Sequence, residues 1–482
     1  MESIRAQVCV LGGGPAGAAT ARRLALLGHS VVVVEKAAFP RERLGESLPG
    51  AVLPLLEVLA IRDAIAIEKF LRPSSAIVRW EGDTDIREVP FPSGFHVNRA
   101  RFDEVLLRAA SDAGARVLQP GRVTHYSSDH NERRTVEVRA NNGVAVRIQS
   151  DFLVDATGRG SSLAGRMKRT GQRTTALYAY WRTLSPIQHE SAIEACPSEW
   201  LWGAALPDNE LNVTAFIDAS CLQEGIAEHS SAERFYDTLI HSSELLSTWV
   251  SGTRVTTVRV CDATPLCHER PVQNRIVKVG DASLSIDPLA AQGVHVALGS
   301  ALHAAAMIHT ILKRPSDERI AEQFYIDRQR RSMVFHAAAA HSLYSSAARR
   351  HPTPFWLSRA ELAKDSSAGN RVVRSDWNGN TAVRVHPDVR FQDVPVIEGE
   401  FIIRAQGISG PGVQSPVVFL DDVPIAPLLA AISGTMQCSD VIRTWSPGVS
   451  PIKGIRVLNY MLHHEILQVL SGPTTGPPAT SS

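Results

Sequence analysis

Paired cysteines and an excess of charge of either sign are missing from this 482-residue chain. Its six cysteines are scattered and include no CxxC pair, so we interpret them as reduced and expect no metal site. The 50 basic and 49 acidic residues leave a formal net charge of +1, which provides no general attraction to nucleic acid. These absences exclude a disulfide-stapled secreted protein and a nucleic-acid binder driven by charge.

We also find no long apolar run in the sequence, and we expect no leader segment. We identify no apolar stretch of about 18 residues without a charge or a turn, and therefore expect neither a membrane span nor a membrane partner. The first motif starts close to Met1, which leaves no room for a signal peptide. We therefore expect a cytoplasmic protein, long enough to form two or three domains.

A strand, a glycine turn and a helix start are present at the N-terminus. The apolar run 7–11 is followed by the glycine turn 12–17, an Ala-rich helical pattern over 18–27, and a second apolar strand over 31–34. This order is typical of a dinucleotide-binding unit. Glu35 ends the second strand, at the spacing expected for a carboxylate that accepts hydrogen bonds from a ribose diol.

Each glycine of the turn has a separate role in this interpretation. Gly12 permits the tight turn, Gly14 lets the backbone approach a pyrophosphate, and Gly17 lets the helix pack closely on the strand. The N–H groups at the helix start then face the phosphates, with help from the helix dipole.

Later segments favour a flavin over a nicotinamide. Arg99 lies at the start of a helical pattern, Asp155 ends a buried-type strand, and Gly280-Asp281 ends another. The helix that starts at Gly293 directs its N–H groups at the isoalloxazine carbonyl in this interpretation. The predicted FAD contacts are Gly12, Gly14, Ala16, Gly17, Glu35, Lys36, Arg43, Ser47, Arg99, Asp155, Gly280, Asp281, Pro288, Gly293 and Val294.

In this order and spacing the motifs resemble the flavoprotein monooxygenase superfamily with the p-hydroxybenzoate hydroxylase-type fold, over roughly residues 5–360. Within it, the segments 45–49 (GESLP) and 287–298 resemble the GES segment and the flavin-facing helix of flavin-dependent halogenases. Trp200 and Trp202 resemble part of the W-x-W-x-I-P signature, although the proline comes two residues later here. These tryptophans are candidate substrate residues, or else a pair on one face of a strand that packs the core.

A lysine that the halogenase resemblance requires is missing. Tryptophan-type halogenases need a lysine between the flavin chamber and the substrate to capture or polarise hypochlorous acid. Alignment of the strand 76–80 with the family puts Pro73 at that place, and proline offers no amine. Arg72 is a poor substitute for a reactive amine, and Lys69 and Lys36 do not fit. Halogenation is therefore the second interpretation.

The first interpretation is hydroxylation of an electron-rich aromatic ring by a C4a-hydroperoxyflavin, which the resemblance implies with O2 as the oxidant. The protein must exclude water, donate hydrogen bonds to the peroxide and hold the ring. Glu46, Gln292 and His295 are the catalytic candidates, with Ser47 as a hydroxyl donor. Alternatively, Glu46 caps a helix and His295 points into the core. No second glycine fingerprint is found, which favours reduction of FAD by NAD(P)H through a partner flavin reductase.

The region 381–470 contains a strand and helical patterns over 425–432, 438–445 and 455–470, and resembles a small winged-helix module. It has few cations, which favours docking of a polypeptide over binding of nucleic acid; alternatively it is a structural cap.

A halogenase-like chain that lacks the lysine and carries such a module resembles the maturation flavoproteins of quinohemoprotein amine dehydrogenases. Those hydroxylate a protein tryptophan during tryptophylquinone biogenesis, which implies a tryptophan in a partner polypeptide as substrate. A geranylgeranyl-type reductase and a non-enzymatic FAD scaffold are the remaining alternatives.

The predicted fold class is α/β, with a Rossmann-type FAD-binding domain and an inserted antiparallel β-sheet substrate domain. The predicted boundaries are 1–73, 98–172 and 263–330 for the FAD domain, 74–97 and 173–262 for the substrate domain, 331–380 for a helical segment and linker, 381–470 for the winged-helix-like docking module, and 471–482 for a disordered tail.

Overall fold

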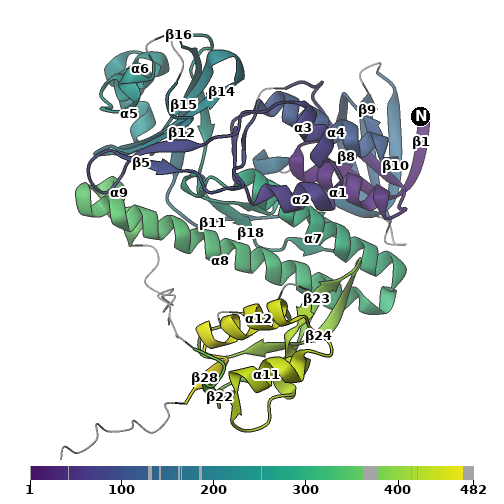
Figure 1. Cartoon of the computed structure of the whole chain (residues 1–482). Coiled ribbons are helices and arrows are strands. Elements are labelled where there is room, and N and C mark those ends of the chain that lie inside the picture. Colours follow the sequence, from purple (N-terminus) through teal and green to yellow (C-terminus); the bar gives the residue numbers. More distant parts are fainter. Residues whose placement is uncertain are drawn as a thin grey trace, which may run out of the picture. The chain divides into compact units, whose positions relative to one another are not determined.

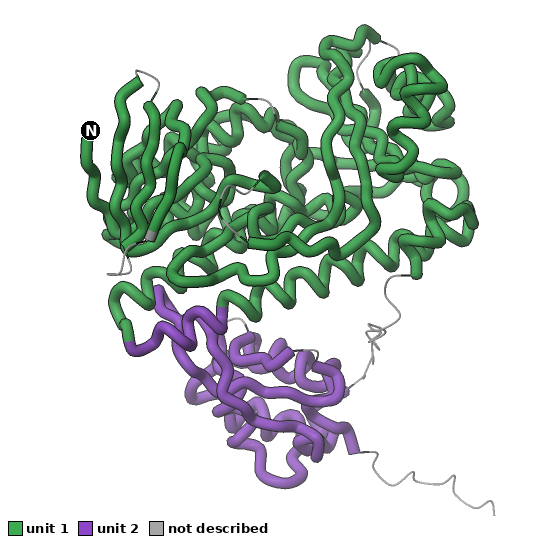
Figure 2. Tube along the Cα trace, turned by 180° about the vertical axis from the view of Figure 1, so that it is seen from behind, with its two compact units in different colours: residues 1–315, 325–366 green, residues 316–324, 367–482 purple. Residues whose placement is uncertain are grey.

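The computed structural model describes residues 2–41, 43–128, 133–140, 143–160, 163, 165–183, 187–250, 252–361, 377–413, 415–420 and 422–470. The predicted tail over 471–482 and the part of the predicted linker over 362–376 lie outside the described residues. The chain divides into two compact units, shown in different colours in Figure 2. Unit 1 contains residues 1–315 and 325–366, and unit 2 contains residues 316–324 and 367–482.

The first sheet of unit 1 is built on five parallel strands in the order β20-β10-β1-β2-β7. Their residues are buried on both faces where the strands cross the core, which is why the sequence shows near-continuous apolar runs there. The strands are β1 (Glu2–Leu11), β2 (Val31–Val34), β7 (Arg116–Leu118), β10 (Ala145–Asp155) and β20 (Ile276–Lys278), joined at the edges by β8 (Gly121–Ser128), β9 (Arg134–Ala140) and β19 (Val272–Gln273).

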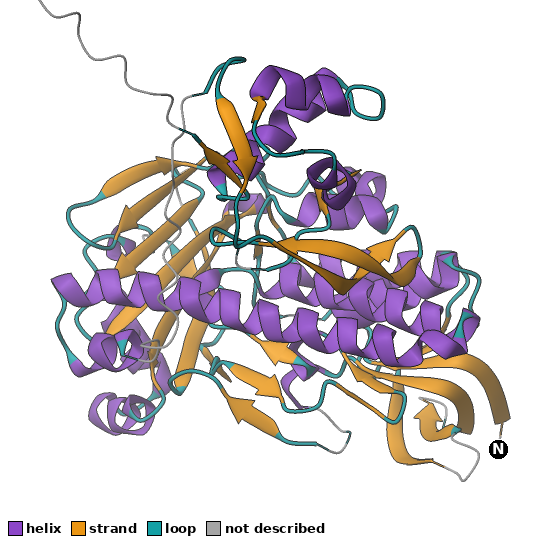
Figure 3. Ribbon diagram, turned by 90° about the horizontal axis from the view of Figure 1, so that it is seen from below, coloured by secondary structure: helices purple, strands orange, loops and turns teal. Residues whose placement is uncertain are grey.

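Helix α1 (Pro15–Leu26) lies between α4 (Arg99–Asp112) and α7 (Gly293–Lys313) in this layer (Figure 1). The small side chains of α1 explain the close packing, because its residues 16–21 are all buried. Residues 325–350 of the long helix α8 (Glu318–Arg350) run beside α7 (Figures 1 and 3). Unit 1 also contains α2 (Val52–Val58), α3 (Arg62–Ile67) and α9 (Pro354–Ala360).

Helix α7 corrects one expectation. Its 21 residues are long and apolar enough to cross a membrane by length and composition, so the expectation that no such stretch exists was wrong. In unit 1, 72% of its most apolar 18-residue window is buried, as in the core helix of a globular domain.

The second large sheet of unit 1, which we call the substrate sheet, has the order β16-β12-β15-β14-β13-β4-β5, with β17 paired to β12. All of its pairs are antiparallel except β4 with β13, which is parallel. Its strands are β4 (Ser75–Arg79), β5 (Asp85–Glu88), β12 (Thr174–Arg182), β13 (Ser191–Ala195), β14 (Glu199–Leu206), β15 (Glu210–Asp218), β16 (Thr253–Arg254) and β17 (Arg259–Asp262).

Alternation along the substrate sheet separates its two faces. Leu177, Leu211 and Val213 point to one face and form a core with Phe235 and Tyr236 from the helical side. The helices on that side are α5 (Cys221–His229) and α6 (Ala232–His241). The opposite face of the substrate sheet is therefore free of these helices and can line a binding site. Short strands complete the unit: β3 (Ser47–Leu48) with β6 (Phe95–His96), and β11 (Met167–Arg169) with β18 (Leu266–His268) and β21 (Leu284–Ser285).

Unit 2 has its own core, formed by buried residues between Val383 and Leu467. Three helices, α10 (Ile425–Ala430), α11 (Cys438–Trp445) and α12 (Pro451–His463), accompany a three-stranded sheet in the order β27-β22-β28 and a long hairpin. The strands are β22 (Ala382–Val385), β23 (Arg390–Glu398), β24 (Phe401–Ser409), β25 (Phe419–Leu420), β26 (Val423–Pro424), β27 (Met436–Gln437) and β28 (Leu467–Val469).

The expected helix over 455–470 is wrong at its end. Helix α12 stops at His463, Glu465 adopts a positive φ of 52°, and the chain then forms β28, which pairs with β22. The predicted α/β fold class, with a Rossmann-type domain and an inserted β-sheet, is otherwise confirmed, although the inserted sheet contains one parallel pair, β4 with β13.

Candidate active site

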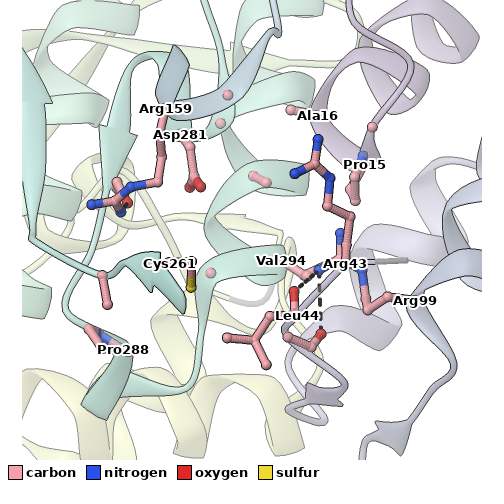
Figure 4. A pocket seen from close by; sticks show the side chains of 18 of the residues that line it. Pro15, Ala16, Arg43, Leu44, Arg99, Arg159, Cys261, Asp281, Pro288 and Val294 are labelled. Atoms are coloured by element: carbon pink, nitrogen blue, oxygen red, sulfur yellow. Dashed lines mark hydrogen bonds between the residues drawn. The ribbon is translucent and has the colours of Figure 1, made fainter. Parts of the chain in front are cut away.

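A cavity of about 820 Å³ extends from the glycine turn to the substrate sheet (Figure 4). This volume lies within the range of cofactor and ligand sites in proteins, roughly 300–1,000 Å³. Of the predicted site residues, the following line it: Gly12, Gly14, Ala16, Glu35, Lys36, Arg43, Glu46, Ser47, Arg99, Trp200, Trp202, Gly280, Asp281, Pro288, Gln292, Gly293 and Val294.

The glycine turn is a close backbone approach that side chains would fill. Gly12 has a φ of +103°, and a Cβ there would lie 2.3 Å from the carbonyl oxygen of Ala156. A Cβ on Gly17 would lie 1.9 Å from the carbonyl oxygen of Gly12, so Gly17 is needed for packing although it does not line the cavity. Helix α1 begins directly after the turn with Pro15, and its unsatisfied N–H groups form an anion-binding end.

Glu35 is buried beside this turn. Its Oε2 accepts a hydrogen bond of 2.7 Å from the backbone N–H of Gly13, and its Oε1 accepts one of 2.8 Å from that of Ala37. Each carboxylate oxygen retains a further lone pair, so Glu35 keeps the capacity to accept from a ribose diol. Arg41, which the sequence interpretation missed, lies 4.0 Å from Glu35 and 3.7 Å from Asp103.

Arginines line the middle of the cavity. Arg99 donates to Asp103 at 3.0 Å and to the carbonyl of Leu44 at 2.8 Å, the latter drawn as a dashed line in Figure 4. Arg43 and Arg159 also line the cavity near the half-buried Asp281. Burial raises the pKa of Asp281, while Arg159, Arg99 and Arg43 oppose this rise. The middle of the cavity is thus suited to an anionic group.

The residues present fit FAD. Within the described part of the chain, the buried Nε atoms of Arg41 and Arg159 have no hydrogen-bond partner, as expected where a diphosphate supplies the missing acceptors. Helix α7 starts at Gly293, which lines the cavity together with Val294 and where an added Cβ would meet no atom within 4 Å. Gly12 and Glu35 would hold the adenosine half, the arginines the diphosphate, and the start of α7 the isoalloxazine.

Asp155 and His295 lie off the cavity wall. Asp155 is buried, accepts from the N–H and hydroxyl of Thr157, and lies 3.4 Å from the ammonium of Lys278. His295 follows the first residues of α7, and burial together with the nearby His336 lowers its pKa. Gln292 lines the cavity, and its Oε1 lies 3.3 Å from Nε2 of His336.

Glu46 is buried where the cavity meets the substrate sheet. The hydroxyl of Tyr180 donates to its Oε1, and the N–H of Gly45 donates to its Oε2 at 3.0 Å. Burial raises the pKa of Glu46, and the bond from Tyr180 opposes this rise in part. A second cavity of about 250 Å³, lined by Tyr180, Asn98 and Thr256 among others, also reaches Glu46. Glu46 therefore contacts both cavities.

One face of β12, β14 and β15 forms the far wall of the main cavity. Trp200 pairs across the strands with Phe216, and their rings stack with centroids 3.8 Å apart. Trp202 and Tyr178 both pair with Thr214. Trp200 is 2% exposed and packs in a core cluster, so the core-packing alternative holds for this residue, while its contact with a substrate stays a prediction.

Several wall residues were missed because no sequence motif marks them. Only strand alternation could have indicated them in the sequence. Alternation assigns a residue to the cavity face only once the register of the neighbouring strands is known. These residues are Tyr178, Ile193, Asn212, Thr214, Phe216 and Cys261, and the loop residues Arg41 and Arg159 were missed as well.

Lysine is missing from the substrate wall. The one lysine among the described lining residues is Lys36, which follows Glu35 at the opposite end of the cavity. Pro73 is buried just before β4 and does not line the cavity. The described residues also contain no group of three or more His, Cys, Asp or Glu side chains placed to hold a metal ion.

Comparison with known proteins identifies relatives among flavin-dependent enzymes, most of them halogenases. A family model described as tryptophan halogenase matches residues 66–385. The tryptophan 2-halogenase of Chondromyces crocatus is 31% identical over 402 residues, covering 80% of this chain and 76% of that protein. The structure of CmlS, a flavin-dependent halogenase, has a TM-score of 0.80 at 22% identity, covering 97% of this chain and 96% of its own. That of QhpG, a peptidyl tryptophan dihydroxylase essential for tryptophylquinone cofactor biogenesis, has a TM-score of 0.74 at 26% identity, covering 95% and 99%.

Proposed function

The chain belongs to the tryptophan halogenase family of flavin-dependent oxidoreductases, and from this premise we propose that it hydroxylates a tryptophan side chain in a partner polypeptide. The observation that carries the proposal is the substrate wall, where aromatic side chains are present and a lysine amine is missing among the described residues. An electron-rich ring held there accepts oxygen without an amine to relay halogen.

Similarity to the dihydroxylase QhpG supports the choice of substrate. The match spans 95% of this chain and so includes residues of both units. Halogenation of a free or carrier-bound aromatic is the second candidate, and the 31% identity to a tryptophan 2-halogenase favours it. The two candidates differ in the atom transferred to the ring.

The chain's own residues perform three tasks in the proposed reaction. When bound, reduced FAD supplies activated oxygen derived from O2. Trp202, Phe216 and their neighbours hold the ring and exclude water, because their side chains are apolar and Phe216 is buried while Trp202 is half-buried. Glu46 holds a proton where the substrate wall begins, and Tyr180 keeps its carboxyl oriented. We propose that a partner flavin reductase supplies electrons from NAD(P)H.

Product masses test the proposal directly. The purified protein is supplied with reduced FAD, O2, chloride and a tryptophan-containing peptide, and the peptide is then analysed by mass spectrometry. We expect a gain of one or two oxygen atoms and no chlorine isotope pattern. A chlorinated product would establish the second candidate and overturn the proposal.

Unit 2 is proposed to dock the partner polypeptide. Its core cluster consists of buried residues between 383 and 467, whereas the other described core clusters contain no residue beyond Trp356.

Truncation before Thr381 is therefore expected to keep FAD binding. It is expected to lower kcat/KM for a polypeptide at least about tenfold, a loss of about 1.4 kcal/mol. Turnover of N-acetyl-tryptophanamide serves as the control and should persist. Equal activity of the truncated and full chains on the polypeptide would contradict docking.

A further inference from the structure

Asn212 is a fully buried amide on the aromatic wall of the cavity. It lies on β15 with Thr214 and Phe216, because residues two apart on a strand share a face. Across the sheet it pairs with Tyr180 on one side and Ala204 on the other. Its amide group therefore lies among cavity-facing side chains that are aromatic, hydroxyl-bearing or aliphatic.

The amide group is held in one orientation. The hydroxyl of Thr214 donates to Oδ1 of Asn212 at 2.7 Å. The other end, Nδ2, is buried and has no hydrogen-bond partner among the described residues. Asn212 is 0% exposed and contributes to the cavity lining, so a group bound in the cavity is the candidate acceptor for this unpaired N–H pair.

An unpaired amide of this kind points to a hydrogen-bond acceptor. A buried polar group without a partner destabilises the fold, so such groups are rare unless a ligand or water completes them. The acceptor has to be an oxygen or nitrogen atom, because Nδ2 can only donate.

The surroundings favour an uncharged acceptor over a carboxylate. The residues that β12 to β15 contribute to the wall are Tyr178, Ile193, Trp200, Trp202, Asn212, Thr214 and Phe216, none of which is charged. Of the nearby charged groups, Arg259 is bonded to Tyr178, Arg159 and Asp262 lie 3.3 Å apart and pair with each other, and Glu46 is bonded to Tyr180. A buried carboxylate would therefore lack a cation of its own.

We propose that the amide nitrogen of Asn212 donates a hydrogen bond to a peptide carbonyl oxygen beside the target indole, and so selects peptidyl tryptophan over the free amino acid. This inference rests on the proposed function, because it assumes an indole substrate. Asn212 is on this view a specificity-determining residue that positions the ring.

Binding to the FAD-loaded, oxidised protein tests the inference without turnover. Three ligands are compared by calorimetry and by the perturbation of flavin absorbance: N-acetyl-tryptophanamide, which has two carbonyls, free tryptophan, and 3-methylindole, which has none. For Asn212→Leu we expect about tenfold weaker binding of N-acetyl-tryptophanamide, the loss of one hydrogen bond, and a change of less than about twofold for 3-methylindole.

Ser191→Ala is the matched control, since Ser191 is a buried polar residue of the same sheet that bonds to His96 and does not line the cavity. It should leave the affinities for all three ligands unchanged. Equal weakening of both indole ligands in Asn212→Leu would assign Asn212 to packing and overturn the inference. Tighter binding of free tryptophan than of N-acetyl-tryptophanamide by the unaltered protein would do the same. Binding of none of the three would overturn the indole substrate itself.

Discussion

Replacement of Gly17 by alanine is expected to abolish stoichiometric FAD binding. The added Cβ would lie 1.9 Å from the carbonyl oxygen of Gly12, and this contact is with backbone, which cannot rotate away. Helix α1 would have to move from the glycine turn, and its N–H groups would leave the phosphate position. Overpacking of this kind costs about 1–3 kcal/mol or more, so the FAD dissociation constant should rise about tenfold to a hundredfold or beyond.

Gly299→Ala is the control for this prediction. Gly299 also lies in a helix, but a Cβ there meets no atom within 4 Å and its φ is not positive. The substitution should therefore leave FAD binding unchanged and increase helix stability slightly, by up to about 1 kcal/mol. Flavin content after gel filtration and fluorescence titration of FAD into apoprotein measure both variants. Full flavin content in Gly17→Ala would contradict the close approach of α1 to the turn.

The nucleotide end of the site was predictable because its signal is local. Within a short stretch, the glycine turn, the start of α1 and Glu35 each need a specific residue type for a stereochemical reason, and that combination is visible in the sequence. The same holds for the turn at Gly280 and for the start of α7 at Gly293.

The substrate end was not predictable because it depends on register between strands far apart in sequence. Alternation shows that Asn212 and Thr214 share a face, but only the pairing of β12, β14 and β15 shows that Tyr178 and Trp202 flank them. The bond from Tyr180 to Glu46 joins residues 134 positions apart and leaves no local pattern. For the same reason the end of α12 was misplaced, since β28 forms only by pairing with the distant β22.

Glu46→Gln is expected to lower kcat for oxygen insertion by about 10²–10⁴-fold, the usual contribution of a positioned proton donor. Glutamine keeps the size of the side chain and an oxygen that accepts from Tyr180, so the cavity stays intact while the acidic proton is removed. FAD content and binding of N-acetyl-tryptophanamide should match the unaltered protein. A kcat within about twofold of the unaltered value would contradict the role of Glu46.

The pH dependence distinguishes proton donation from mere packing. Burial raises the pKa of Glu46, so the acid form persists to higher pH than in an ordinary glutamate, and activity should fall as pH rises through this raised value. The hydrogen bond from Tyr180 lowers the Glu46 pKa in part, so Tyr180→Phe should raise that pKa further. The falling limb of the pH–kcat profile should therefore move to higher pH in Tyr180→Phe and be missing in Glu46→Gln.

The same raised pKa has a consequence for stability that does not require turnover. Because the folded-state pKa of Glu46 lies above its unfolded value, the protonated form favours folding at low pH, and this advantage is lost as pH rises through the folded pKa. The neutral glutamine of Glu46→Gln removes this dependence, so the variant should have a higher Tm than the unaltered protein in alkaline buffer and a similar Tm in acid. If the two Tm curves run parallel from acid to alkaline pH, Glu46 is not the buried acid that this mechanism requires.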